Sequence, residues 1–80
     1  MQDTFPLTAL CPGGRAVVCG LSAGQDMRRR FQELGLIDGT PVECLTRSPL
    51  GDPTAYEIRG AVIALRKEDA AGIQIRKELS

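Results

Sequence analysis

The segment that most constrains the fold is residues 22–41, SAGQDMRRRFQELGLIDGTP, because it marks both ends of one short helix and the start of a strand. Ser22 and Gln25 fit a capping box, in which the two side chains satisfy free backbone N–H groups of the first helical turn. After the helix, Asp38-Gly39 is typical of a tight turn, and Pro41 cannot continue a helix but can begin a strand. We therefore expect one helix that leads directly into β structure.

The apolar residues of this helix predict a single buried face. Met27, Phe31 and Leu34 recur at helical spacing, so they form one stripe. Gly35 can adopt the left-handed conformation that ends a helix, and Leu36 is then placed to contact Phe31, as in a Schellman motif. The helix should end at this glycine.

The rest of the chain reads as short strands separated by turns. Apolar and β-branched residues predict strands at residues 15–21, 42–47, 55–59, 61–66 and 73–76. Gly20 is expected to mark a bulge or bend. The nearly continuous apolar run of residues 61–66 is typical of a strand covered on both faces, so we expect it to be the most buried one. Residues 67–72 are long enough for one helical turn.

Two turns complete the pattern. Cys11-Pro12-Gly13-Gly14 ends a lead-in segment, and the two prolines of residues 48–53 place that loop at the tip of a hairpin. Five short strands without long crossovers predict a mostly β fold, a small SH3-like five-stranded partly open barrel with the helix inserted after the first strand. Residues 1–80 should form a single domain, with the barrel interior filled by side chains.

Composition excludes several classes of function. Ten basic and ten acidic side chains cancel, which removes the electrostatic footprint expected of a nucleic-acid binder. The chain has no histidine, so neither a catalytic triad nor a Cys-His pair can form, and no phosphate-binding loop motif is present. We therefore expect a protein that is not an enzyme and that binds no cofactor.

The cysteines and the hydropathy pattern bear on metal binding and location. Cys11, Cys19 and Cys44 are odd in number and widely spaced, which suits reduced, buried thiols better than disulfides or a metal site. No apolar run approaches the roughly 20 residues that span a bilayer, and the first residues lack the pattern of a signal peptide. These features predict a cytoplasmic protein without direct membrane insertion.

The whole pattern resembles the FeoA family of small accessory proteins of bacterial ferrous-iron uptake. The matching features, from residue 7 to about residue 76, are Leu7-x-x-Leu10, Pro12-Gly13, Arg30, Leu34-Gly35-Leu36-x-x-Gly39, Val42, Pro49-Leu50-Gly51-Asp52-Pro53, Arg59-Gly60, Ala64-Leu65-Arg66-Lys67 and Ala70. The positions expected to define the fold are Leu10, Gly13, Phe31, Leu34, Gly35, Leu36, Gly39, Gly51 and Leu65. The sequence departs from the family where Asp38 stands in place of a frequent proline, and where the helix carries three consecutive arginines.

The resemblance implies a function as well as an SH3-like barrel. It implies a non-enzymatic module that binds and regulates the ferrous-iron transporter FeoB, a membrane protein with a cytosolic GTPase domain. The alternative is a regulatory domain like those of metal-dependent transcription regulators, which act on a protein or nucleic-acid partner outside transport. The balanced charge and the scarcity of aromatic residues argue against nucleic acid.

Two places are candidates for contact with a protein partner. Arg28 and Arg29 form either a solvated helix face or a docking surface for an acidic patch. Leu50 and Asp52 belong either to a rigid hairpin tip or to a preorganised recognition loop. With only three aromatic residues, the barrel is not expected to bind proline-rich peptides. An open edge of the barrel could also support weak self-association.

Overall fold

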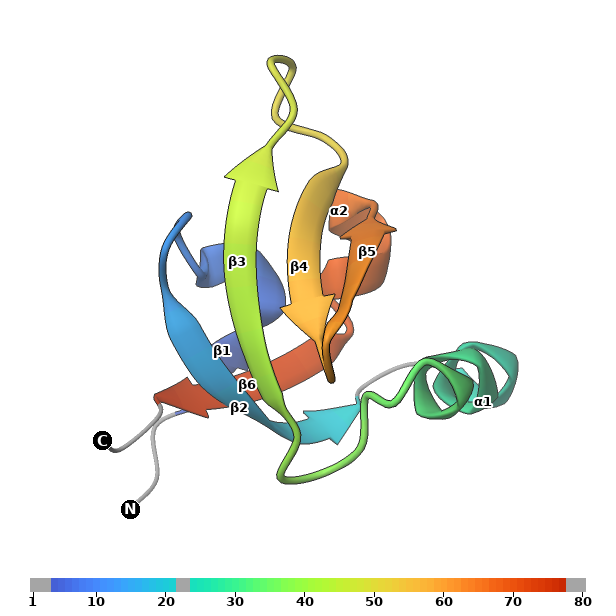
Figure 1. The fold of residues 1–80 in the computed structure, drawn as a ribbon. Coiled ribbons are helices and arrows are strands. Elements are labelled where there is room, and N and C mark those ends of the chain that lie inside the picture. The colour runs from blue at the N-terminus through green and yellow to red at the C-terminus, as the bar shows by residue number, and fades with distance from the viewer. Residues whose placement is uncertain (1–3, 22–23, 78–80) are drawn as a thin grey trace.

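The computed structural model describes residues 4–21 and 24–77, and this part of the chain forms one curled antiparallel sheet with a helix beside it (Figure 1). The elements in chain order are β1 (Phe5–Pro6), the 3₁₀ turn η1 (Leu7–Ala9), β2 (Arg15–Leu21), α1 (Gln25–Glu33), β3 (Pro41–Arg47), β4 (Thr54–Ile58), β5 (Ala61–Leu65), α2 (Lys67–Ala70) and β6 (Ile73–Lys77).

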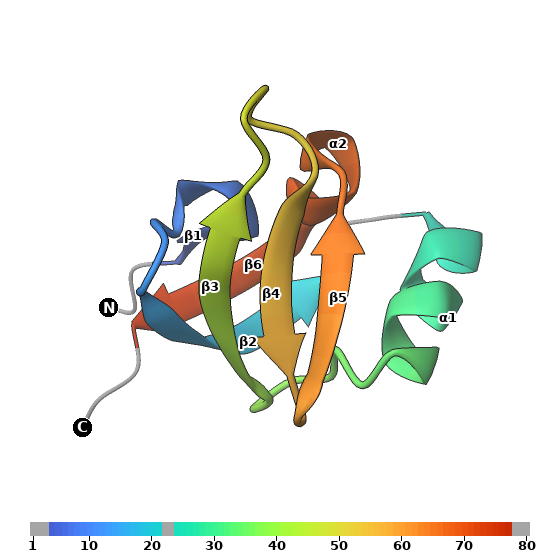
Figure 2. The same ribbon diagram turned by 45° about the horizontal axis from the view of Figure 1, so that its top comes forward.

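The sheet has the strand order β1-β6-β2-β3-β4-β5, and it curls without closing. Figure 2 shows β3, β4 and β5 in front of β2 and β6, with α1 next to β5. The predicted class, a mostly β, partly open small barrel, is confirmed. The strand count was too low by one, because the two residues of β1 are too few to show an alternating pattern. The helix consequently follows β2 rather than the first strand.

The barrel interior is filled by apolar side chains from β2 to β6, from η1 and from both α-helices, and Phe5 of β1 packs against it. The tight spacing of strands leaves room for side chains but not for a ligand, as expected for a small barrel. The buried set is Leu7, Leu10, Ala16, Val18, Phe31, Leu36, Val42, Cys44, Tyr56, Ile58, Leu65, Ala70, Ile73 and Ile75.

The predicted end of helix α1 is confirmed in detail. The N–H of Leu36 donates to the carbonyl oxygen of Phe31 at 2.9 Å, and the N–H of Gly35 donates to that of Gln32 at 3.0 Å. These are the two bonds of a Schellman motif, and Gly35 has the required positive φ of 92°. Leu36 and Phe31 are both buried in the core.

The start of α1 and one residue of its stripe differ from the prediction. The helix begins at Gln25 with Gly24 at the N-cap position, and Ser22 lies outside the described residues. Phe31 is buried and Met27 partly so, but Leu34 is 38% exposed, so its assignment to the buried stripe was wrong. Leu34 is the C-cap residue of α1, directly before the chain turns at Gly35, and its position at the end of the helix leaves the side chain partly in solvent.

The expectation that residues 61–66 form the most buried strand was also wrong. They form β5, which lies at the end of the strand order, so that β4 is its only neighbour. Val62 is 67% exposed, Ala61 and Ala64 are exposed, Ile63 is half-buried, and only Leu65 is buried. A continuous apolar run is compatible with a covered central strand and with an uncovered edge strand, and its composition alone does not separate the two.

The predicted turns are confirmed. Gly14 N–H donates to the Cys11 carbonyl oxygen at 2.8 Å, with Gly13 at a φ of 88°. Thr40 N–H donates to the Ile37 carbonyl oxygen at 3.0 Å across the turn that contains Gly39. The pairing of β2 with β6 shifts register between Val18 and Gly20, as a bulge requires. Neither helix within residues 4–21 and 24–77 is long and apolar enough to cross a membrane.

Candidate functional site

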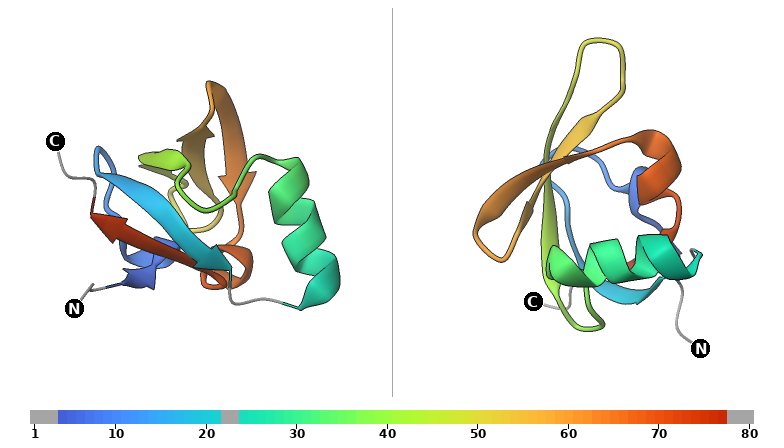
Figure 3. Two further views of the ribbon diagram at one scale, coloured as in Figure 1. Left: turned by 90° about the horizontal axis from the view of Figure 1, so that it is seen from below. Right: turned by 90° about the vertical axis from the view of Figure 1, so that its right-hand side faces the viewer.

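The predicted contact residues lie at two separate places on the molecule. Arg28 and Arg29 are on α1, beside the open part of the sheet, whereas Leu50 and Asp52 are at the tip of the β3–β4 hairpin. The right-hand view of Figure 3 shows the hairpin tip and α1 on different parts of the barrel. The structure therefore does not bring the two pairs together into one site.

The arginines of α1 are exposed, and their charges are not neutralised by ion pairs in the described part of the chain. Arg28, Arg29 and Arg30 are all exposed, and in the described part of the chain the single ion pair joins Arg15 Nε and Glu43 Oε1, 3.2 Å apart, on the sheet. Pairs between residues i and i+4 within α1 are not formed at ion-pair distance there. The helix thus presents unneutralised guanidinium groups to solvent.

The loop at the tip of the β3–β4 hairpin is held by its own polar groups. Asp52 N–H donates to Ser48 Oγ at 3.0 Å, and Gly51 N–H donates to the Ser48 carbonyl oxygen at 2.8 Å. The Asp52 carboxylate accepts a hydrogen bond from the N–H of Lys67, the first residue of α2, at 2.8 Å. This bond satisfies a free N–H at the helix start. Leu50 remains 94% exposed on a loop that is fixed at both ends.

A groove that the sequence analysis missed lies between α1 and β5. We call it the α1–β5 groove; its volume is about 240 Å³. This is below the roughly 300 to 1,000 Å³ of typical small-molecule sites, so it suits individual side chains of a larger partner. Its lining is mostly apolar, with Arg30 and Asp69 as the charged groups: Met27, Arg30, Phe31, Leu34, Ile63, Ala64, Leu65 and Asp69.

The apolar residues that form this groove are visible in the sequence, but their pattern predicted that they would be buried in the core. Leu34 and the apolar run of β5 were both interpreted as buried, and both instead contribute to the rim and wall of the α1–β5 groove. Val62, at 67% exposure, extends the apolar surface along the same strand.

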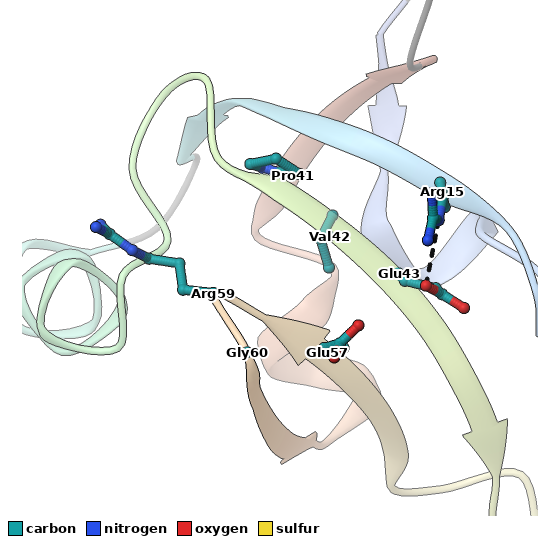
Figure 4. Close-up of a pocket in the computed structure, with 7 residues that line it drawn as sticks. All are labelled: Arg15, Pro41, Val42, Glu43, Glu57, Arg59 and Gly60. Carbon is teal, nitrogen blue, oxygen red and sulfur yellow. Dashed lines mark hydrogen bonds and ion pairs between the residues drawn. The ribbon is translucent and has the colours of Figure 1, made fainter. Parts of the chain in front are cut away.

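A second depression, of about 310 Å³, lies on the outer face of β2, β3 and β4 (Figure 4). Arg15, Glu43 and Glu57 line it, and Glu43 lies directly opposite Glu57 in the strand register. Like charges in this arrangement repel, and the ion pair with Arg15 offsets part of that repulsion.

Arg59 lines the same depression, but its side chain extends toward the end of α1 (Figure 4). A Cβ atom added to Gly35 would lie 2.7 Å from Arg59 Cδ. The stem of Arg59 therefore packs on the glycine that ends the helix. A cation there also interacts favourably with the free carbonyl groups of the helix C-terminus.

The buried titratable groups are part of the core. Burial raises the pKa of the Cys44 thiol, with the nearby charge of Arg47 acting in the opposite direction. Burial likewise raises the pKa of the Tyr56 hydroxyl. Arg47 Nη2 donates to the Leu10 carbonyl oxygen at 3.1 Å and so fixes the lead-in segment to β3. Among the residues that the structure describes, no three His, Cys, Asp or Glu side chains are grouped to hold a metal ion.

Comparison with known proteins gives one consistent family. The model of the FeoA domain matches residues 5–77. A relative from Porphyromonas gingivalis, the Fe(2+) transport protein A/Fe(2+) transporter FeoB fusion protein, is 33% identical over 69 residues. The match covers 86% of this chain but only 8% of that much longer relative.

Solved structures of the same family have the same fold. The FeoA protein of Chlorobium tepidum is 34% identical, with a TM-score of 0.86, over 91% of this chain and 70% of that one. The FeoA of Stenotrophomonas maltophilia, solved as a zinc complex and described as an SH3 domain protein, is 26% identical, with a TM-score of 0.76, over 92% of this chain and 99% of that one.

The fold also occurs in a protein of another kind. A manganese-dependent transcriptional repressor superposes with a TM-score of 0.87 at 22% identity, over 98% of this chain and 44% of that one. At this level of identity the likeness extends to the fold and not to the activity.

Proposed function

The chain belongs to the FeoA domain family, and we propose that it is a non-enzymatic cytoplasmic module that binds the ferrous-iron transporter FeoB and regulates its nucleotide cycle or assembly. The observation that carries this proposal is the fusion protein of Porphyromonas gingivalis, whose name joins an Fe(2+) transport protein A to FeoB in one chain. Joining two modules gives them a high effective concentration for each other, which favours a direct contact between them. We infer the same pairing for this chain.

The chemistry of the chain supports a role in binding rather than catalysis. It contains no histidine, and its three cysteines are spread over an exposed turn, β2 and the buried face of β3. What it offers to a partner is surface: the exposed arginines of α1, the α1–β5 groove and the exposed Leu50. Arginine is enriched at protein interfaces, and the buried centre of an interface is more apolar than the rest of the protein surface.

The test is calorimetric titration of this protein into purified full-length FeoB from the same organism, with GTP hydrolysis followed in parallel. We expect saturable binding and a change in the hydrolysis rate. Saturable binding without any rate change would support docking and refute regulation of the nucleotide cycle. Absence of binding in the nucleotide-free, GDP-bound and GTP-analogue-bound states would refute the proposal.

A further inference from the structure

The two edge strands of the sheet, β1 and β5, differ in how well they could pair with a further strand. At one end, β1 is two residues long and contains Pro6, and both features prevent another strand from pairing there. At the other end, β5 has five residues, AVIAL, without a proline, a charge or a bulge (Figure 2). Natural sheets usually block an exposed edge of this kind, because it is a template for pairing with another chain. The β5 edge carries none of these blocking residues, and α1 lies beside it across the α1–β5 groove (Figure 2).

The backbone groups available on β5 follow from its turn. Arg59 and Gly60 both have positive φ, 53° and 83°, as in the type I′ turn of a two-residue hairpin. The residue pair that closes such a turn is hydrogen-bonded, and bonded and non-bonded pairs then alternate along the strands. The N–H and C=O groups of Val62 and Ala64 therefore point away from β4. Within the described residues these groups take part in no hydrogen bond with the loops or with α1.

The residues around the β5 edge indicate which side chains an added strand should carry. The α1–β5 groove lies beside β5 and provides apolar walls from Leu34 and Ile63. Arg59 precedes the strand, Arg66 follows it, and Arg30 lies in the groove; none of the three is ion-paired in the part of the chain that the structure describes. Two acidic groups lie near the same edge: Asp69 in the groove lining, and Glu57 opposite Val62 on β4. The three arginines therefore outnumber them.

We propose that β5 accepts an extended segment of FeoB as an additional strand, apolar in its middle and carrying carboxylates at its ends. This inference rests on the proposed function and specifies the contact. The unpaired backbone groups of Val62 and Ala64 provide affinity for an extended chain of any sequence. The apolar groove and the bracketing arginines then favour apolar residues next to β5 and carboxylates beyond them.

Amide hydrogen exchange of the ¹⁵N-labelled protein, with and without full-length FeoB, tests the contact without altering the chain. The amides of Val62 and Ala64 should exchange quickly in the free protein, and at least about tenfold more slowly in the complex, because each gains a hydrogen-bond partner. Binding with protection elsewhere and none at these two amides would overturn the inference while leaving the proposed function intact. No binding at all would overturn both. Protection in concentrated protein without FeoB would assign the edge to a second copy of this chain and overturn the choice of FeoB.

Two substitutions at one position separate backbone pairing from side-chain contact. Val62→Pro removes an N–H that faces away from β4, so the hairpin should be retained, and it blocks the edge. We expect FeoB binding to weaken about tenfold or more. Val62→Thr keeps the N–H and nearly the same shape, and should bind within a few-fold of the wild type. Equal affinity for both variants, each with an unchanged unfolding midpoint, would overturn strand addition.

Discussion

Two glycines with the same φ but different surroundings allow the packing of Arg59 on helix α1 to be measured. Gly35 and Gly39 both have a φ of 92°. A Cβ atom on Gly39 would meet nothing within 4 Å, whereas one on Gly35 would lie 2.7 Å from Arg59 Cδ. Gly39→Ala should therefore cost only the left-handed backbone conformation, about 1–2 kcal/mol of unfolding free energy.

Gly35→Ala should cost the same amount plus the displacement of Arg59. The atom in the way belongs to a flexible side chain, so the helix end need not unfold. Forcing a side chain out of its preferred rotamer costs about 0.5–1.5 kcal/mol, which gives about 1.5–3.5 kcal/mol in total. Urea unfolding followed by circular dichroism would measure the difference between the two variants, provided that the m-value is unchanged.

A double-mutant cycle with Arg59→Ala checks the cause. Without the side-chain stem of Arg59, the cost of Gly35→Ala should fall to that of Gly39→Ala, because the two positions then share the same backbone cost. The reasoning fails if Gly35→Ala remains more costly than Gly39→Ala in the Arg59→Ala background. It also fails if the two single glycine variants have equal stability.

Three further predictions concern the charged and titratable groups. Replacing Arg28 and Arg29 by Glu should weaken FeoB binding at least about tenfold. The unfolding free energy should change by less than about 0.5 kcal/mol, because both side chains are exposed. Unchanged affinity by calorimetry would show that this helix face is not part of the interface. Asp52→Ala should cost about 0.5–2 kcal/mol in urea unfolding, since it removes the acceptor for Lys67 N–H at the start of α2, and an unaltered midpoint would contradict that role. Burial raises the pKa of Cys44 in the folded state, so the contribution of this thiol to stability should be complete below the unfolded thiol pKa of about 8.5 and should decrease as the pH rises above it. Cys44→Ala should flatten this alkaline decrease in the unfolding free energy. An identical pH profile for the variant and the wild type would refute the role of Cys44.

The local rules of helices and turns gave most of the fold from sequence. The stop at Gly35, the turns at Gly13 and Gly39 and the hairpin tip at residues 48–53 all depend on backbone conformations that a few residue types favour strongly. Because each signal is contained within a few neighbouring residues, no knowledge of the tertiary structure was needed to find it.

The roles that depend on distant partners were beyond sequence analysis. Asp52 was interpreted as a contact residue for a partner, and that interpretation stays a prediction. In the fold its carboxylate meets the first N–H of α2, which lies 15 residues further along the chain. The contact of Arg59 with Gly35 also joins two elements that are separate in sequence. Both contacts join residues that only the folded sheet brings together.

The largest error of the sequence analysis coincides with the proposed binding edge. Five apolar residues in a row normally predict a strand covered on both faces, because exposing them to water is unfavourable. In this fold the run became an edge strand with Val62 exposed beside the apolar α1–β5 groove. Local pattern and global environment disagree at this place, and such disagreements are expected where a sequence serves function rather than stability. A strand added to β5 would cover this edge and give the run the buried environment that its composition favours.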